Sequence, residues 1–238
     1  MTGRPPTPPA RRALPGRRAV LAGLAGVAPL VVAGCALIGE AAKPGKTAGV
    51  QEPDPGRAAF VMIIRHGEKP DGSHPGLDEA GRPDGKSLTR RGWERAEALP
   101  TLFSPPVPGL QVPARILAAA DVGPHAGAHR MRQTVGPLAR ALGLTVNTGY
   151  AETQESALAG AVLADSARPT SDTGEAQPVL ICWEHSRIPR IVEALGAAHT
   201  GVPAEWPDRF DTIWTFSRPA GGAWAFHEVR QHLLDGDT

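Results

Sequence analysis

The sequence predicts an α/β protein with a mostly parallel central sheet, helices on both faces of that sheet and an antiparallel C-terminal hairpin. Three observations predict this class. The short apolar runs 60–64 and 178–184 are typical of buried strands. Segments with apolar residues at helical spacing alternate with such runs, and this order of elements builds parallel sheets. The runs 213–216 and 224–229 flank turn residues and predict the hairpin.

The first predicted strand, 60–64, is followed by a loop over 69–86 that is rich in Pro, Asp and Gly. A long loop at a strand end is a usual place for lids and specificity elements. Thr89 can cap the helix that follows, because its hydroxyl can accept a hydrogen bond from an N–H of the first turn. Pro100 should kink or end this helix. Its apolar positions recur at helical spacing and are Trp93, Ala96, Leu99 and Phe103.

The next helix is predicted over 130–142, where one face is apolar and Gly143 is suited to end the helix. That face consists of Met131, Val135, Leu138 and Leu142. The other elements are weaker or shorter. We predict strands over 115–120 and 144–147, a weak helix over 155–164, a surface loop over 167–177, a strand over 178–184 that leads into His185, and a helix over 188–197.

The N-terminal residues 1–34 have the features of an export signal. They contain five arginines and no acidic residue, and the uncharged stretch 19–34 is too short for a membrane span and suits a signal peptide. Arg17 and Arg18 precede that stretch, as in a twin-arginine signal. The stretch closes on Val32, Ala33, Gly34 and Cys35, which resembles a lipobox. An ordinary cleaved signal peptide and an uncleaved anchor are the alternatives.

This pattern predicts three regions: a twin-arginine-like lipoprotein signal peptide at 1–34, a flexible linker at 35–57 after a lipidated Cys35, and one catalytic domain at 58–238. The protein would be exported and held on the outer face of the cytoplasmic membrane through the lipid. The formal charge of the whole chain is +1, so the part after the signal peptide is acidic. This argues against nucleic-acid binding. Cys182 lies in an apolar run and is most simply a small buried side chain.

Two predicted strand ends each provide a histidine. Arg65 and His66 follow the first strand, His185 follows the strand over 178–184, and Arg130 begins a helix. Because open α/β sheets bind ligands at the carboxyl ends of their strands, we expect these four side chains to converge. Guanidinium groups, imidazoles and a helix N-terminus together favour a phosphate.

The sequence resembles the histidine phosphatase superfamily, which is also called the phosphoglycerate-mutase-like family. The resemblance extends over about residues 59–230, and its motifs occur in the order of the family. They are Arg65, His66 and Gly67, then Leu88, Thr89, Gly92 and Ala96, then Arg130, Gln133 and Thr134, and finally His185. The resemblance implies the phosphoglycerate-mutase-like α/β fold.

The resemblance also implies a metal-independent and cofactor-independent phosphatase that acts on a small phosphorylated molecule. His66 would attack phosphorus and become a phosphohistidine, which water then hydrolyses. Arg65, Arg130 and His185 would bind the phosphoryl oxygens, and His129 is a further candidate for substrate binding. The attacking nitrogen of His66 has to be unprotonated, and a backbone carbonyl that accepts from the other ring nitrogen would hold this tautomer.

The family's usual proton donor is a carboxylate downstream of the second arginine. We expect Glu155 in this role, because it opens a predicted helix, and Glu152 and Glu184 are the alternatives. The chain departs from the family at Ser186 and Arg187, where a glycine often follows the second histidine. It also lacks the serines often found before Arg130 and the frequent Trp, Glu, Gly stretch. These departures bear on the substrate and the proton donor.

Two other classes of function are open to the sequence. One is a binding or structural lipoprotein that keeps the fold and the anion pocket without turnover. The other is a metal site. Its ligands would be His66, Glu68, His74 and His185. Their spacing fits no compact ligand motif, and the two arginines would repel a divalent cation. His125, Arg187 and Arg190 are most simply solvated.

Overall fold

The computed structural model describes residues 58–123, 126–166 and 177–237. The predicted signal peptide, the linker and Cys35 lie outside the described residues, as does most of the predicted loop 167–177. All described residues belong to one unit of the chain, Ala48–Thr238. Within the described part, none of the helices has the length and apolar character needed to cross a membrane.

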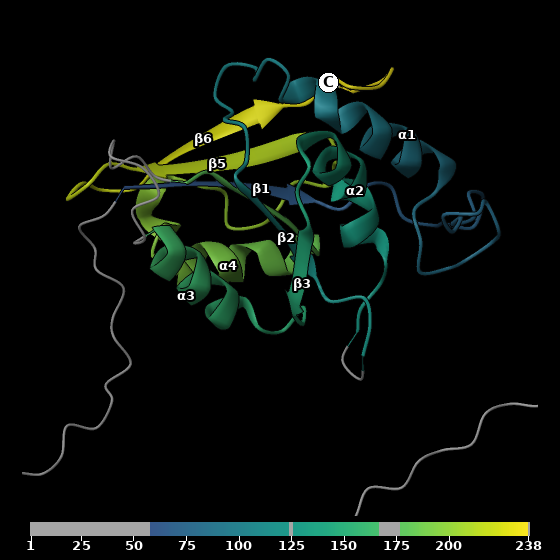
Figure 1. Ribbon diagram of the computed structural model, residues 1–238, viewed down its shortest axis with the longest axis horizontal. Helices are drawn as coiled ribbons and strands as arrows, with labels where there is room; N and C mark the ends of the chain where they lie inside the picture. Colours follow the sequence, from purple (N-terminus) through teal and green to yellow (C-terminus); the bar gives the residue numbers. More distant parts are fainter. Residues whose placement is uncertain (1–57, 124–125, 167–176, 238) are drawn as a thin grey trace, which may run out of the picture. The chain divides into compact units, whose positions relative to one another are not determined.

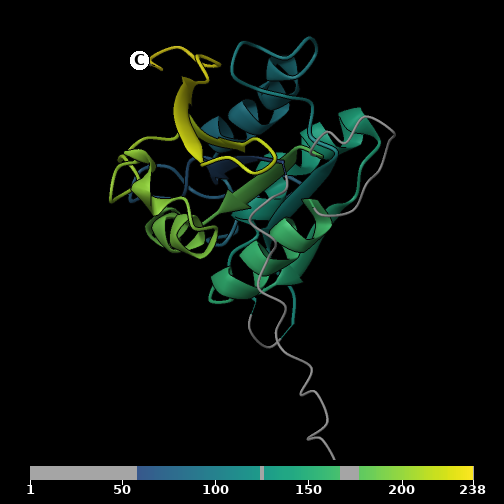
Figure 2. The ribbon, with the colours of Figure 1, turned by 90° about the vertical axis from the view of Figure 1, so that its left-hand side faces the viewer.

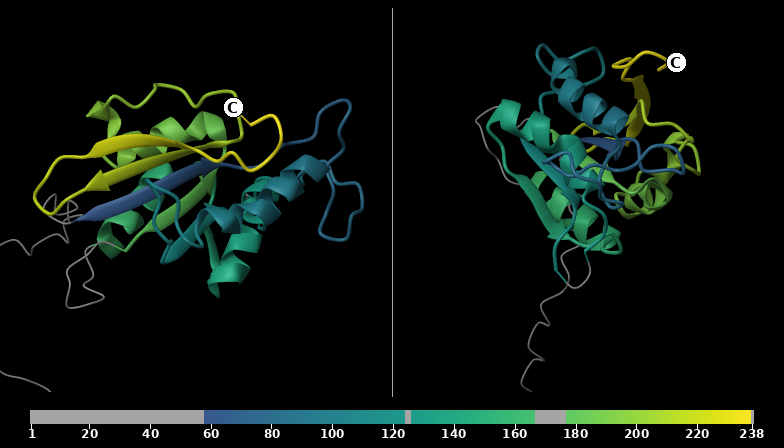
Figure 3. Two further views of the ribbon diagram at one scale, coloured as in Figure 1. Left: turned by 90° about the horizontal axis from the view of Figure 1, so that it is seen from above. Right: turned by 90° about the vertical axis from the view of Figure 1, so that its right-hand side faces the viewer.

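A six-stranded sheet with the order β3-β2-β4-β1-β5-β6 forms the centre of the domain (Figure 1). Its strands are β1 (Ala59–Arg65), β2 (Arg115–Ala119), β3 (Val146–Tyr150), β4 (Val179–Trp183), β5 (Thr212–Arg218) and β6 (Ala225–Arg230). The pairs β2–β3, β2–β4 and β1–β4 are parallel, and β1–β5 and β5–β6 are antiparallel. The predicted fold class is confirmed. Figure 3 shows β1, β5 and β6 side by side.

The helices cover the two faces of the sheet in pairs. α1 (Arg90–Ala98) packs against α2 (Arg130–Leu142), and α3 (Glu155–Ser166) packs against α4 (Ile188–Ala194). The two pairs lie on opposite faces, as Figures 1 and 2 show. Buried aliphatic side chains from both faces of the central strands fill the space between the layers, which explains why β1 and β4 read as unbroken apolar runs.

Helix boundaries follow the predicted capping residues. The Thr89 hydroxyl accepts from the backbone N–H of Gly92 at 3.2 Å, and α1 ends at Ala98, two residues before Pro100. The next residues, Leu99–Leu102, form a 3₁₀ turn. At the end of α2, Gly143 adopts the left-handed conformation with φ 66°.

Strand β3 begins later than the predicted range 144–147. The backbone N–H of Leu144 closes the end of α2 by donating to the Ala139 carbonyl at 2.8 Å, so that residue is not available to the sheet. β3 is also an edge strand whose side chains are alternately half-buried and exposed. An edge strand of this kind carries no apolar run that could mark its limits.

The register of the sheet places the predicted site. In the parallel pair β1–β4, Arg65 is the partner of Trp183, so the residues that follow each strand emerge next to each other. These residues are His66 after β1 and Glu184 and His185 after β4. The switch from parallel to antiparallel pairing occurs at β1, between β4 and β5. Ligand sites in open sheets lie beside such strand ends.

Candidate active site

His66 is held by backbone contacts at the end of β1. Its backbone N–H donates to the Trp183 carbonyl at 3.2 Å, and its ring Nδ1 lies 2.7 Å from the Gly67 carbonyl oxygen. A carbonyl can only accept, so Nδ1 carries the proton and Nε2 keeps a free lone pair. The side chain is 1% exposed. Desolvation by burial lowers the pKa of His66 to about 4, and the charges of Arg130 and Arg65 act in the same direction.

Residues from the three motifs that contain Gly67, Leu88 and Arg130 contact one another around Gly67. Its backbone N–H donates to the Thr134 hydroxyl at 2.8 Å, and that hydroxyl donates to the Arg130 carbonyl at 2.7 Å. A Cβ on Gly67 would lie 3.1 Å from the Gly92 carbonyl oxygen, a tight contact with backbone. The Gln133 side chain accepts from the backbone N–H of Leu88 at 3.0 Å. Residues far apart in sequence are thus fixed around the histidine.

Two arginines direct guanidinium groups to this region. Arg65 is 3% exposed, and its Nη1 lies 3.3 Å from a carboxylate oxygen of Asp208. Its guanidinium carbon lies 4.0 Å from the centre of the Phe210 ring. Arg130 is half-buried and donates to the Gly85 carbonyl at 3.3 Å. Within the described residues, the buried Nε atoms of both arginines lack a hydrogen-bond partner. Burial lowers the pKa of each arginine.

Buried guanidinium donors that lack a partner are a usual feature of anion sites, and the charges of both arginines act on His66. A phosphoryl group has enough oxygens to accept from both arginines at once.

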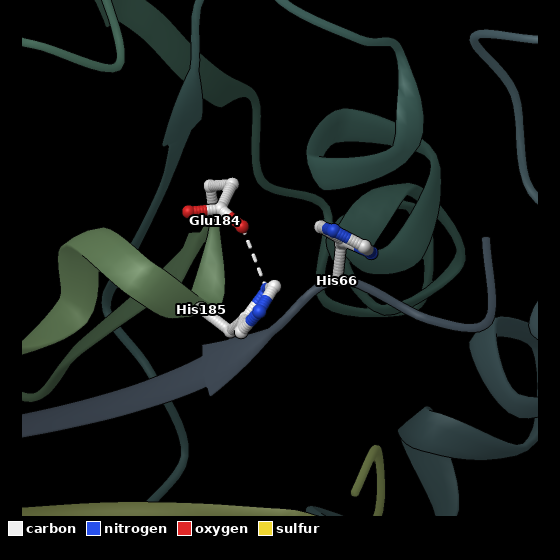
Figure 4. Close-up of side chains that lie close together, drawn as sticks. All are labelled: His66, Glu184 and His185. Atoms are coloured by element: carbon white, nitrogen blue, oxygen red, sulfur yellow. Dashed lines mark ion pairs between the residues drawn. The ribbon is translucent and has the colours of Figure 1, made fainter. Parts of the chain in front are cut away.

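His185 approaches His66 from the end of β4, as Figure 4 shows. Its Nδ1 lies 2.6 Å from a carboxylate oxygen of Glu184, and one ligand atom each from His66, Glu184 and His185 lies within 4.8 Å of the others. Burial lowers the pKa of His185, and the charge of Arg65 adds to this. Burial opposes ionisation of Glu184, but its hydrogen bonds with Ser186 and the charge of His185 outweigh this and lower its pKa.

The pKa of Glu152 is shifted in the opposite direction, above its ordinary value. Burial raises its pKa first, the Glu184 carboxylate raises it further, and Arg130 acts against both. The carboxylate lies against the backbone of Gly127, where a Cβ would come within 2.2 Å of Oε1. Trp183 and Arg187 both donate to the Glu152 carbonyl, at 3.2 and 2.8 Å. The backbone of Glu152 is therefore anchored beside Arg130 and Glu184.

Glu155, the expected proton donor, opens α3 but is engaged elsewhere. Its carboxylate lies 2.6 Å from Nη2 of Arg187, and the residue is 6% exposed. Among the described residues, no hydrogen bond or ion pair joins it to His66, Arg65, Arg130 or His185. The sequence analysis treated Arg187 as solvated, whereas its guanidinium holds both Glu155 and the Glu152 carbonyl. That interpretation of Arg187 is corrected.

His129 lies next to Arg130, with its Nδ1 3.4 Å from a carboxylate oxygen of Asp121. Its imidazole is thus directed to an acid at the end of β2, and the described residues show no contact with His66. A role for His129 with substrate stays a prediction. His125 lies outside the described residues.

The metal site expected as an alternative is not assembled from its four predicted ligands. Glu68 is paired with Arg95 at 2.8 Å, and the exposed His74 is paired with Asp71 at 3.1 Å. His66 and His185 do come together, with Glu184 as a third group that could bind a metal ion. A divalent cation at this point would face the charges of Arg65 and Arg130, which favours an anion instead.

Three residues of this region were missed by the sequence analysis. Asp208 and Phe210 follow Trp206 in an irregular segment before β5 and contact Arg65. A polar segment that lacks periodicity gives no signal for such a contact. Arg95 is buried in α1 and binds Glu68, which follows Gly67. Its position on the helix face of Leu88 and Gly92 was the only available signal.

No family model matches the sequence, and no curated protein is similar to it. Several solved structures are similar to it at low sequence identity. A mycobacterial glucosyl-3-phosphoglycerate phosphatase has a TM-score of 0.44 and 14% identity over 71% of this chain and 97% of its own. A putative phosphohistidine phosphatase SixA from Nakamurella has a TM-score of 0.43 and 17% identity over 76% of this chain and 99% of its own.

A phosphoglycerate mutase from Plasmodium falciparum has a TM-score of 0.43 and 10% identity over 76% of this chain and 98% of its own. Two of these three solved structures are thus named as phosphatases and one as a phosphoglycerate mutase.

Proposed function

We propose that the protein is a phosphatase that hydrolyses a phosphomonoester through a phosphohistidine on His66. The observation that carries the proposal is the state of this imidazole. It is unprotonated at neutral pH, its Nδ1 is bound to the Gly67 carbonyl, the charges of Arg130 and Arg65 act on it, and His185 lies close to it. A neutral imidazole beside two cations with unused donors is suited to attack an anion that those cations bind.

In the first step, the Nε2 lone pair of His66 forms a bond to phosphorus while the bond from phosphorus to the leaving oxygen breaks. Arg65, Arg130 and His185 bind the equatorial oxygens, whose charge they stabilise in the transition state. In the second step, a water molecule attacks phosphorus, the P–N bond breaks and inorganic phosphate leaves. The Gly67 carbonyl keeps the same tautomer of His66 through the cycle.

We assign the proton of the leaving alcohol to Glu152, in place of Glu155. Two carboxylates lie in the site, and their surroundings move their pKa values apart: that of Glu152 is raised and that of Glu184 is lowered. Pairs of carboxylates whose pKa values are moved apart are typical of sites where one acid donates a proton, and the raised pKa favours Glu152 for that role. Glu152 would donate its proton to the leaving oxygen and take one from the attacking water in the second step.

Hydrolysis of p-nitrophenyl phosphate tests the proposed function directly. We expect turnover that orthovanadate inhibits and that a chelator leaves unchanged, because vanadate takes the geometry of the transition state and the proposed step uses no metal. Activity that a chelator abolishes and zinc restores would replace the phosphohistidine step by metal catalysis at His66, Glu184 and His185. Binding of phosphate without any turnover would favour the non-catalytic anion-binding alternative.

Substitution of the two acids separates their roles. Glu152→Gln should lower kcat/KM for an alkyl phosphate such as glycerol 2-phosphate by roughly 10²- to 10⁴-fold, because an alkoxide leaves poorly without a proton. The same variant should change kcat/KM for p-nitrophenyl phosphate little, since p-nitrophenolate leaves unprotonated. The matched control is Glu155→Gln, which removes the charge from the pair with Arg187.

The pH profile of kcat/KM for the alkyl phosphate gives a second measure of the same assignment. It should fall below about pH 4, where His66 becomes protonated, and it should fall on the alkaline side where Glu152 loses its proton, above the ordinary range of a glutamate. In Glu152→Gln only the acid limb should remain. An equal loss with both substrates, or a larger loss in Glu155→Gln, would remove Glu152 from this role.

A further inference from the structure

A cavity of about 500 Å³ lies beside the proposed phosphate site, between the loop after β1 and the N-terminus of α1. Two of the residues that line this cavity adjoin the proposed phosphate site. Glu68 is the second residue after His66, and Phe210 is the residue whose ring stacks on Arg65 at 4.0 Å and lies 6.4 Å from the His66 ring centre. A phosphate on His66 therefore has this cavity as a neighbour. Its volume falls in the range of small-molecule sites.

The acidic residues of the cavity already have hydrogen-bond donors of their own. Glu68 accepts from Arg95 at 2.8 Å and lies 3.4 Å from Arg91. Asp71 accepts from the backbone N–H groups of Ser73 and His74 at 2.7 and 2.8 Å, and from the His74 ring at 3.1 Å. These contacts leave neither carboxylate free to attract a cation.

Two basic residues of the cavity lack such partners. Lys69 and Arg90 are exposed, and within the described part of the chain neither makes a hydrogen bond through its side chain or an ion pair. The charge of Lys69 also helps to lower the pKa of His185. Leu77, Pro75 and Phe210 supply apolar surface beside these cations.

We propose that this cavity binds the leaving group of the substrate, and that Lys69 and Arg90 bind a second anionic group on it, a carboxylate or a further phosphate. The inference deepens the proposed function and depends on it. The preferred substrate is then a phosphomonoester with an acidic, partly apolar organic part. Arg65 and Arg130 bind the phosphoryl group that is transferred, and the cavity selects among phosphomonoesters by charge.

The test compares 4-carboxyphenyl phosphate with 4-carbamoylphenyl phosphate, which have the same shape and differ in one charge. In the unmodified protein we expect kcat/KM to be about tenfold higher for the carboxylate, and this ratio should fall as salt is added. Lys69→Met and Arg90→Met should each lower the ratio by about two- to fivefold, and the double variant should bring it close to one. Any effect of the lost Lys69 charge on His185 acts on both substrates, so it cancels in the ratio.

Arg190→Met is the matched control, because Arg190 is an exposed arginine on α4 that does not line the cavity. The substituted side chains are exposed, and equal thermal midpoints confirm that the variants fold. A ratio near one in the unmodified protein overturns the subsite and leaves the proposed function standing. The same holds if Arg190→Met lowers the ratio as much as the cavity variants do. Absence of turnover with both substrates overturns the proposed function itself.

Discussion

Replacing His66 with alanine is expected to lower kcat/KM for p-nitrophenyl phosphate by roughly 10³- to 10⁶-fold, as removal of a nucleophile does in enzymes with covalent intermediates. The unmodified protein, mixed rapidly with a ³²P-labelled substrate and quenched in alkali, should carry label that is stable to base and lost in acid, as expected for a phosphoramidate bond. His66→Ala should carry none. The reason is the free Nε2 of the His66 imidazole, which the alanine variant lacks.

His199→Ala is the control for this experiment. His199 is exposed in the short turn Ala198–Thr200, so its loss should change neither the label nor the rate. His66→Asn is a second variant, because its amide can still donate to the Gly67 carbonyl while it lacks a nucleophile. If either His66 variant kept the acid-labile label, the phosphorylated residue would be another one, and the assignment of His66 would be lost.

Replacing Arg95 with methionine is expected to destabilise the fold by about 3–5 kcal/mol. Arg95 is 3% exposed and donates to both Glu68 and Asp237 at 2.8 Å, and to the Gln231 side chain at 3.3 Å. Its removal leaves two largely buried carboxylates with only the exposed Arg91 as a cation, because methionine fills the space but gives no hydrogen bond. Urea unfolding followed by tryptophan fluorescence measures the loss.

Arg91→Met is the matched control, because Arg91 approaches the same two carboxylates from solvent. Its side chain is 44% exposed and lies 3.4 Å from Glu68 and 3.6 Å from Asp237. An exposed pair of this kind contributes about 0–1 kcal/mol. Equal losses in the two variants would show that burial of Arg95 does not set its contribution.

The difference in stability between Arg95→Met and the unmodified protein should depend on pH. The hydrogen bond from Arg95 is the first cause that lowers the pKa of Asp237, which falls to about 2. An acid whose pKa is depressed in the folded state stabilises the fold above its ordinary pKa, near 3.8, and this contribution is lost as the pH falls toward 2. The difference between Arg95→Met and the unmodified protein should therefore narrow below about pH 4.

Strong local signals allowed much of the fold to be predicted from the sequence. β1 and β4 are buried on both faces and therefore read as unbroken apolar runs, and α2 has one apolar face and a glycine at its end. β3 was misplaced because an edge strand carries a weak pattern and because Leu144 serves the end of α2. The spacing of apolar residues indicates which elements are buried, and it does not locate an element that is half-exposed.

The same contrast between strong and weak sequence signals applies to the candidate site. The register of β1 and β4 brings His66 and His185 together, which strand-end reasoning could anticipate. The proposed choice of Glu152 over Glu155 could not be anticipated, since it depends on which carboxylate Arg187 engages. The contacts of Arg65 with Asp208 and Phe210 span more than 140 residues of sequence, and no local pattern encodes them.

The pairing of Arg65 with Asp208 would affect the release of inorganic phosphate at the end of the proposed catalytic cycle. The Asp208 side chain is fully exposed, at 100%, so it moves through water at little cost and holds the guanidinium only weakly. When inorganic phosphate departs, this tethered carboxylate can return to the vacated guanidinium before a second phosphate arrives. An internal competitor of this kind would weaken inhibition by product.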